Sequence, residues 1–241
     1  MVIWALYDDA SRCYYEALKD KHKVIGIGIN SHQTDYLQLD LSITNHNLIK
    51  ELEKLPLPDL IIASPPCMAW SIADSAFCLV KSVDSESDNN FSYFKLRKFN
   101  FYNQNNLDPT KGKRDPFKRM QSFLNGLSCI TGLIKIINYF KPKYYVIENP
   151  ETSKIWDVIK YLDFYDNNYI NKTYYSNYDL NFSLKPTIFL SNYELNLERD
   201  YQKRTKYKSV LDLNRQKRSD IPLELIREIV SQSEVKNDSE S

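Results

Sequence analysis

The sequence predicts an α/β fold built on a mostly parallel β-sheet with helices on both faces. Short apolar runs typical of buried strands alternate along the chain with stretches of helical periodicity. The chain has 241 residues, 42% of them hydrophobic, which is enough for one sizeable core. Two proline-containing motifs directly follow predicted strands. Because parallel sheets bind ligands beyond the carboxyl ends of their strands, both motifs are candidates for a functional site.

The expected elements follow one another in the order of an alternating fold. Strands are expected over 2–7, 23–29, 37–41, 59–63, 144–147 and 187–190. Helices are expected over 12–21, 45–54 and 117–140. Residues 81–116 are polar and without clear periodicity, so we expect a long mobile insertion there. Residues 231–241 are expected to form a disordered tail.

Composition narrows the class of protein. The net charge is only +1, so attraction to nucleic acid would have to come from local clusters of charge. The four cysteines form no Cys-x-x-Cys pair, and we expect no metal site. We find neither a signal-peptide pattern nor an apolar run near 18 residues, so we expect no membrane association. These features predict an intracellular protein with reduced thiols.

Cys67 is the first candidate catalytic residue, because it follows Pro65 and Pro66 at the end of a predicted buried strand. The two prolines stiffen the turn and could present a side chain above the sheet edge. A thiolate is a strong nucleophile, although free cysteine needs activation. The alternative is an inert cysteine buried behind a tight turn.

Glu148 is the second candidate, at the end of another predicted strand and before Asn149-Pro150. A carboxyl group at a sheet edge can act as a general acid when its surroundings favour the protonated form. The alternative is a helix cap or a carboxylate held in a structural ion pair.

Four motifs in order resemble those of DNA (cytosine-5) methyltransferases, in the form of the short phage and viral members. Ser64-Pro65-Pro66-Cys67 is similar to their Pro-Cys motif, and 147–150 (Ile-Glu-Asn-Pro) to their Glu-Asn motif. Lys185-Pro186-Thr187 with Ser191-Asn192 resembles a later segment, and 218–222 (Arg-Ser-Asp-Ile-Pro) a C-terminal motif. The similarity extends over roughly residues 1–230.

The resemblance implies a Rossmann-like methyltransferase fold with a small C-terminal recognition appendage. It implies transfer of a methyl group from S-adenosylmethionine to C5 of a cytosine flipped out of the duplex. Cys67 would attack C6, Glu148 would supply a proton at N3, and Lys185 would provide charge where the family carries arginine. The alternative for Lys185 is a solvated lysine. The implied divisions are a catalytic domain at 1–190, a reduced recognition segment at 191–217 and a returning helix at 218–230.

The cofactor turn departs from the family pattern. The family has a glycine-rich turn after its first strand, whereas residues 6–12 (Leu-Tyr-Asp-Asp-Ala-Ser-Arg) contain no glycine. Asp40 matches an acidic residue expected near the adenine amine; its alternative is a turn or helix-start residue. The predicted cofactor-binding residues are Tyr7, Asp8, Asp9, Ser11, Asn30, Asp40 and Pro65.

Double-stranded DNA is the expected partner. Basic residues with interleaved tyrosines gather in 199–218, and a second basic cluster lies in 111–119. Solvated faces are the alternative for both clusters. The predicted DNA-binding residues are Ser71, Arg114, Lys203, Arg204 and Lys206. We also expect a monomer, with a cognate restriction endonuclease as a candidate partner.

Two other functions compete with this prediction. An amino-methyltransferase would share Ser64-Pro65-Pro66, but it needs an aromatic residue in the place of Cys67. A catalytically inactive homologue would act as a DNA-binding or anti-restriction protein, which the glycine-free turn favours. The expected location is the cytoplasm of a bacterial or phage-infected cell, or the nucleus or cytoplasm for a eukaryotic virus.

Overall fold

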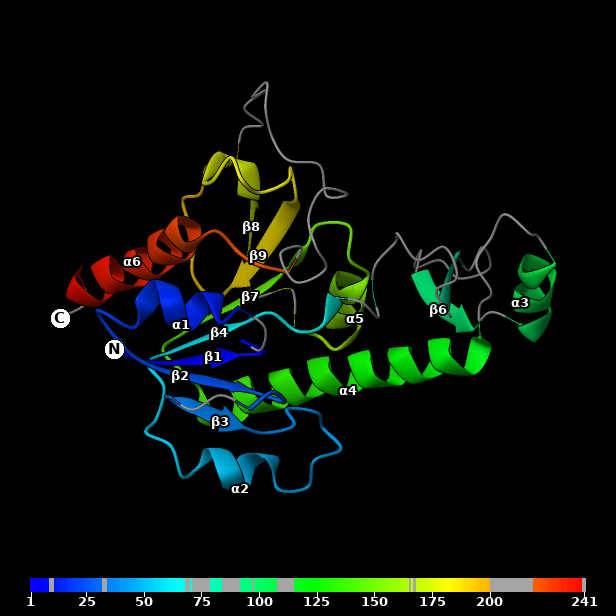
Figure 1. Ribbon diagram of the computed structural model, residues 1–241, viewed down its shortest axis with the longest axis horizontal. Coiled ribbons are helices and arrows are strands. Elements are labelled where there is room, and N and C mark those ends of the chain that lie inside the picture. Colours follow the sequence, from blue (N-terminus) through cyan, green and yellow to red (C-terminus); the bar gives the residue numbers. More distant parts are fainter. Residues whose placement is uncertain are drawn as a thin grey trace.

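In the computed structural model, a seven-stranded sheet forms the centre of the molecule (Figure 1). The structure describes residues 1–8, 11–31, 34–67, 70, 79–83, 92–96, 98–107, 115–164, 166, 168–199 and 219–239. The strands are β1 (Val2–Leu6), β2 (Lys23–Gly28), β3 (Tyr36–Gln38), β4 (Leu60–Ala63), β7 (Tyr144–Pro150), β8 (Tyr169–Tyr174) and β9 (Pro186–Ser191). Their order in the sheet is β3-β2-β1-β4-β7-β9-β8.

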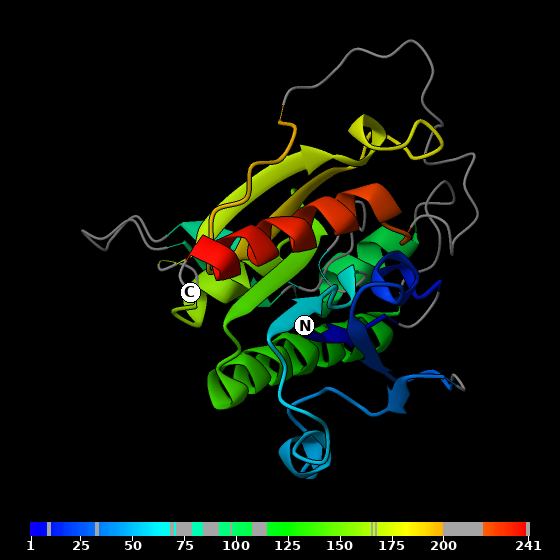
Figure 2. The same cartoon turned by 90° about the vertical axis from the view of Figure 1, so that its left-hand side faces the viewer.

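The sheet is parallel except at β9, which runs antiparallel to both of its neighbours, β7 and β8. Helices cover both faces (Figures 1 and 2). The predicted Rossmann-like fold, with a mostly parallel sheet between helices, is therefore confirmed. In such a sheet the carboxyl ends of β1, β4 and β7 share one edge, which is where ligands bind.

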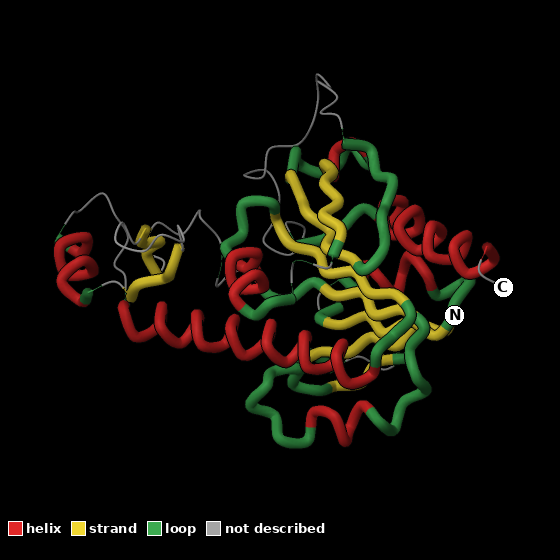
Figure 3. The backbone as a smooth tube through the Cα atoms, turned by 180° about the vertical axis from the view of Figure 1, so that it is seen from behind, coloured by secondary structure: helices red, strands yellow, loops and turns green. Residues whose placement is uncertain are grey.

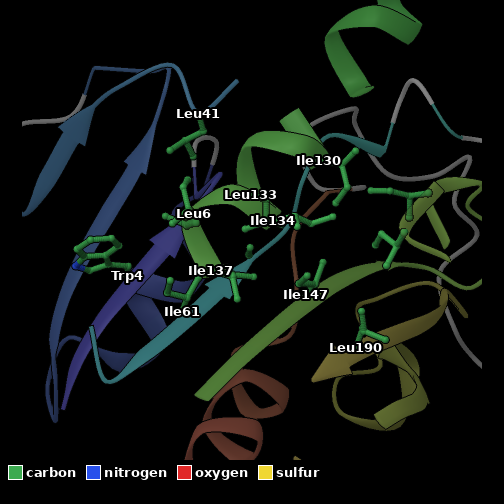
Figure 4. Close-up of a cluster of buried hydrophobic side chains, with 14 of the residues drawn as sticks. Trp4, Leu6, Leu41, Ile61, Ile130, Leu133, Ile134, Ile137, Ile147 and Leu190 are labelled. Atoms are coloured by element: carbon green, nitrogen blue, oxygen red, sulfur yellow. The ribbon is translucent and has the colours of Figure 1, made fainter. Parts of the chain in front are cut away.

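The alternation of side chains along β1 divides the core into two layers. Trp4 and Leu6 point to the layer covered by α4 (Pro116–Phe140) and α5 (Ile155–Tyr161), with α2 (Leu48–Leu52) at its margin (Figures 3 and 4). Ile3 and Ala5 point to the opposite layer, covered by α1 (Cys13–Leu18) and α6 (Leu223–Ser239). All four of these β1 side chains are fully buried, so the apolar run is a strand packed on both faces.

Helix α4 extends well beyond the sheet (Figure 1). Asp115 caps its first turn by accepting the Phe117 and Lys118 N–H groups, and Pro116 suits the first helical position. The C-terminal half is packed on the sheet, whereas Phe117 is 73% exposed near the start. Although no apolar run near 18 residues was expected, α4 is long and apolar enough to cross a membrane by length and composition alone. A core helix of a soluble protein passes the same test, so one such helix is weak evidence for a membrane span.

The insertion at 81–116 contains secondary structure that the sequence pattern did not predict. β5 (Leu79–Val83) and β6 (Ser92–Leu96) form a two-stranded antiparallel sheet, and α3 (Phe99–Asn106) follows. Among the described residues, each of these two strands pairs only with the other, and neither is part of the seven-stranded sheet. The sequence pattern did not predict these segments, and the mobility of the insertion stays a prediction.

Three further elements differ from the sequence-based expectation. Helix α5 and strand β8 were not predicted; β8 is an edge strand of mixed polarity, which hides its pattern. The tail expected to be disordered continues α6 as far as Ser239. Two bonds help to hold this extension: the Gln232 amide accepts the Asn196 N–H and donates to the Asn196 carbonyl.

Candidate active site

The two proline-containing motifs meet at the carboxyl edge of the sheet. β4 and β7 are neighbours, with Ala63 paired to Ile147. Residues 64–67 directly follow β4. Glu148 and Asn149 are among the last three residues of β7. The arrangement that the strand pattern predicted, with both motifs at one edge, is therefore present.

The Pro-Pro-Cys turn is fixed from several sides. The Asn149 amide donates to the Pro65 carbonyl over 2.9 Å, and the Ser64 N–H donates to the Leu6 carbonyl over 3.3 Å. After the turn, the Trp70 N–H donates to the Cys67 carbonyl, and the Trp70 side chain is fully buried. Cys67 itself is an exposed residue and is not enclosed behind the turn.

Glu148 lies in a nearly closed environment, with 4% of its surface exposed. The Tyr175 hydroxyl donates to its Oε1 over 2.7 Å. The Lys185 ammonium lies 3.5 Å from the same oxygen, and the Lys185 side chain is only 19% exposed. Lys185 is thus not a freely solvated lysine, and Glu148 is a paired carboxylate facing the Cys67 turn.

The electrostatics of Cys67 connect the three predicted catalytic residues. Although Cys67 is an exposed residue, neighbouring atoms desolvate its thiol, and this raises the pKa of Cys67. The charge of Lys185 opposes that shift, whereas the charge of Glu148 adds to it. Cys67, Glu148 and Lys185 therefore act on one another across a single site, built from the ends of β4, β7 and the start of β9.

Two buried tyrosines belong to this site that the sequence motifs did not identify. Tyr175 is bonded to Glu148, and the Tyr14 hydroxyl is hydrogen-bonded to that of Ser64, directly before the prolines. Burial and the charge of Glu148 raise the pKa of both tyrosines well above 10, so both hydroxyls stay neutral. Neither residue has a local sequence signal, because each reaches the site only through the fold.

The glycine-free turn after β1 has a backbone conformation that usually favours glycine. Tyr7 and Arg12 adopt left-handed conformations, with φ of 63° and 50°, which glycine adopts without strain. A cavity of about 200 Å³ opens beside this turn; its lining is Tyr7, Asp8, Ser11, Arg12, Cys13, Tyr14, Ser64, Pro66, Ser219, Asp220 and Ile221. The cavity lies beyond β1 and β4, where a Rossmann-like sheet binds its cofactor, so its position and the shape of the turn fit such a group.

The side chains predicted to bind the cofactor are largely engaged in the protein itself. The Asp8 carboxylate accepts the Tyr14 and Tyr15 N–H groups at the start of α1, and it is buried. The Ser11 hydroxyl donates to Asp220, and the Tyr7 hydroxyl donates to the Cys129 carbonyl.

Three further predicted cofactor residues that the structure describes, Asn30, Asp40 and Pro65, do not line the cavity. Asp40 accepts the N–H and the hydroxyl of Ser42, which matches the alternative of a turn residue. Asn30 is exposed just after β2. Pro65 is buried and offers its carbonyl to Asn149. Asp9 is outside the described residues.

All five predicted DNA-binding residues lie outside the part of the chain that the structure describes. Arg199, the first basic residue of the 199–218 stretch, is described and exposed. It borders a second cavity of about 480 Å³ with Glu151, Ile170, Lys172, Thr173, Tyr174 and Pro186. Tyr174 and Pro186 precede and follow the site residues Tyr175 and Lys185, so this cavity lies beside the candidate active site.

No protein-family model and no curated protein matches this chain. Among solved structures, it resembles a DNA modification methyltransferase encoded within an E. coli prophage, with 15% identity and a TM-score of 0.40, over 79% of this chain and 46% of the other. It also resembles the Entamoeba histolytica methyltransferase EhMeth, with 12% identity and a TM-score of 0.47, over 84% and 57%. A third is the S. pombe Dnmt2 methyltransferase, with 15% identity and a TM-score of 0.42, over 82% and 51%. The chain thus spans about half the length of the structures that it resembles. Its own strand order shows the Rossmann-like fold.

Proposed function

We propose that this protein is a DNA cytosine-5 methyltransferase that works through a covalent adduct at Cys67. The observation that carries the proposal is the convergence of Cys67, Glu148 and Lys185 at one sheet edge. The addition of a nucleophile to an electron-poor ring needs a thiol that a substrate can reach, a carboxyl group and a nearby cation, and the site contains all three. The order of the four family-like motifs along the chain supports the same reaction.

The chemistry follows from the three side chains. With the target base flipped out of the duplex, the Cys67 thiolate adds to C6 of cytosine, forming the S–C6 bond. The electron pair of the C5–C6 double bond is delocalised toward N3, which takes a proton from Glu148, so C5 becomes a nucleophile. Bound S-adenosylmethionine would supply the methyl group that C5 accepts. A base then removes the C5 proton, and that electron pair restores the double bond as the Cys67 sulfur leaves. N3 returns its proton to the Glu148 carboxylate.

Lys185 supports this addition electrostatically. Its charge lowers the pKa of Cys67, against the desolvation that raises it, and so favours the thiolate. Its ammonium also lies beside Glu148 Oε1. One cation thus lies close to both the nucleophile and the carboxyl group, where the family-like motif would carry arginine. A lysine offers a point charge without the planar fork of a guanidinium.

Double-stranded DNA is the proposed substrate, and S-adenosylmethionine the proposed methyl donor in the cavity beside the β1–α1 turn. The basic stretch beginning at Arg199, with Lys203, Arg204 and Lys206, is proposed to contact phosphates, as are Arg114 and Ser71. Binding to DNA as a monomer, in the cytoplasm of a bacterial or phage-infected cell, completes the proposal.

A mechanism-based trap tests this function. The substrate is a pool of random-sequence duplexes in which 5-fluorocytosine replaces cytosine, because fluorine blocks removal of the C5 substituent. With S-adenosylmethionine present, the wild type is expected to form a complex with DNA that survives denaturation. Cys67→Ala should form none, whereas Cys129→Ala should behave as the wild type because Cys129 belongs to α4 and not to the Pro-Pro-Cys turn. Absence of a wild-type adduct would contradict the proposal.

One observation favours a second function, that of an inactive homologue that binds DNA. The Asp8 carboxylate already accepts hydrogen bonds from the N–H groups of Tyr14 and Tyr15, at the turn where a cofactor would bind. Calorimetric titration with S-adenosylmethionine, with and without duplex DNA, separates the two functions. Heat of binding supports the enzyme; DNA binding without any cofactor binding supports the inactive homologue.

A further inference from the structure

We propose that Tyr175 is the positioning residue of the candidate active site: its hydroxyl assigns Glu148 Oε1 as an acceptor and leaves Oε2 to carry the proton delivered to the base. This inference rests on the proposed function. Tyr175 belongs to none of the motifs that suggested the site, and it would act through Glu148 without touching the substrate.

The contacts around the Glu148 carboxyl are one-sided. Oε1 receives the Tyr175 hydroxyl at 2.7 Å and has the Lys185 ammonium at 3.5 Å. Among the residues that the structure describes, no side chain or backbone group donates a hydrogen bond to Oε2. A carboxyl group that accepts donors on one oxygen places an added proton on the other oxygen. The proton that Glu148 holds is therefore directed to Oε2.

Tyr175 is well suited to remain a donor. It is 1% exposed, and its ring packs against Phe182 with centroids 6.0 Å apart. Burial, with the nearby charge of Glu148, raises the pKa of Tyr175 well above 10. Its hydroxyl therefore keeps its single proton throughout the range in which a protein of this kind works, and the assignment of the two carboxyl oxygens does not change with pH.

The same tyrosine also holds the cation of the site. The Lys185 ammonium lies 4.7 Å from the centre of the Tyr175 ring, within reach of a cation–π interaction. The Tyr175 N–H donates to the Lys185 carbonyl over 3.4 Å. The cross-strand pair Tyr174–Pro186 sets both residues side by side at the end of the β8–β9 hairpin. One residue thus orients the acid and fixes the charge that assists the nucleophile.

Tyr175→Phe tests the inference, because it removes the hydroxyl and retains the ring that holds Lys185. The rate of adduct formation with the 5-fluorocytosine duplexes should fall about 10- to 100-fold, because the lost hydrogen bond is to a carboxyl group that becomes charged as it gives up its proton. The DNA concentration giving half the maximal rate should stay within about 3-fold, since the buried hydroxyl cannot touch DNA. Tyr178→Phe is the matched control; its hydroxyl bonds Glu228 and the Glu198 N–H, away from the site, and its rate should be unchanged.

A second substrate separates positioning from a merely structural role. Pyrimidin-2-one lacks the 4-amino group of cytosine, so its C6 accepts a thiolate with less help from an acid. In duplexes carrying this base the loss caused by Tyr175→Phe should be clearly smaller; an equal loss on both bases, or none on either, would overturn the inference. Replacement of Tyr175 by 3-fluorotyrosine, which keeps the donor, should retain the wild-type rate within about 3-fold, and a larger loss would also count against it. A wild type that reacts with neither base refutes the proposed function itself.

Discussion

At the scale of single residues, the reactivity of Cys67 depends on a balance of opposing influences. Desolvation and the charge of Glu148 raise the pKa of the thiol, while the charge of Lys185 lowers it. Because the thiolate is the nucleophile, the reaction needs a nearby group that favours ionisation of Cys67. The positive charge of Lys185 has this effect.

Substitution of Lys185 and substitution of Glu148 should shift the pH dependence of Cys67 reactivity in opposite directions. Lys185→Gln removes the charge that lowers the pKa of Cys67, so alkylation of the thiol should require a higher pH. Glu148→Gln removes a charge that raises this pKa, so the same curve should move to lower pH. The rate of iodoacetamide labelling of the Cys67 peptide, followed by mass spectrometry from about pH 7 to about pH 10, measures both shifts.

Two comparisons make the labelling experiment specific. Lys172→Gln removes a lysine that is paired with Glu151, away from the thiol, and should leave the profile of Cys67 unchanged. Cys13 serves as an internal reference, since burial raises its pKa to about 12 and it should label far more slowly. Shifts of Cys67 in the same direction for both site variants would refute the electrostatic account.

At the scale of single elements, α4 is placed by a close backbone contact and is terminated by a left-handed residue. Gly132 lies where α4 meets the segment after β3; a Cβ at this position would be 2.1 Å from the Leu41 carbonyl oxygen. At the other end, Lys141 takes the left-handed conformation that terminates the helix, with φ of 45°. The sequence contains glycine where the backbone approaches closely and lacks it where the turn would favour it.

Gly132→Ala is expected to destabilise the protein. Alanine would improve helix propensity by about 1 kcal/mol, but the contact is with backbone atoms that cannot move aside, and overpacking of this kind costs about 1–3 kcal/mol or more. A contact of 2.1 Å with a backbone oxygen places the cost at the upper end of that range, so the net loss should be about 2 kcal/mol in the free energy of unfolding by urea. The neighbouring exposed Lys135→Ala should change it by less than about 0.5 kcal/mol. A Gly132 variant as stable as the wild type would mean that the two segments do not pack as described.

Lys141→Gly is expected to stabilise the protein. Relief of the left-handed strain is worth about 1–2 kcal/mol, and the greater freedom of glycine in the unfolded chain offsets part of it. A net gain of about 0.5–1 kcal/mol in the free energy of unfolding should result. Lys160→Gly, in the last turn of α5 with ordinary helical geometry, should instead lose about 1 kcal/mol. Equal effects at the two lysines would contradict the backbone assignment.

At the scale of the whole molecule, the C-terminal helix closes the fold onto its beginning. α6 packs with α1 over one face of the sheet, and Arg227 donates to the Ala17 carbonyl. Just before α6, Asp220 accepts the Ser11 hydroxyl beside the β1–α1 turn. The two ends of the described chain therefore build one layer of the core and one wall of the cavity next to the site.

Ile229→Ala should weaken this whole layer. The Ile229 side chain is fully buried, and truncation to alanine removes apolar contacts and leaves a cavity. A loss of about 2–5 kcal/mol in the free energy of unfolding is expected. Val235→Ala, on the same helix but 69% exposed, should cost less than about 0.5 kcal/mol. If both variants unfolded alike, α6 would not be the cover of this face.

The sequence by itself determined the alternating fold, the site edge and three of its side chains. Strands β4 and β7 are short apolar runs ended by proline motifs, so the positions of Cys67 and Glu148 follow from local pattern. Lys185 was found through motif order. Three elements were not predicted: β8, α5 and the last part of α6. Their sequences show no clear strand or helix pattern, and these elements depend on the segments that pack against them.

Only the tertiary structure decided what surrounds those three side chains. Tyr175 reaches Glu148 across 27 positions of sequence, and Tyr14 reaches Ser64 across 50. It also decided that the Asp8 carboxylate binds the start of α1, where motif order alone suggested a cofactor contact. The physical reason is range: strand propensity and turn stiffness act between neighbours along the chain, whereas the partner of a buried hydroxyl or carboxylate is set by how distant segments pack.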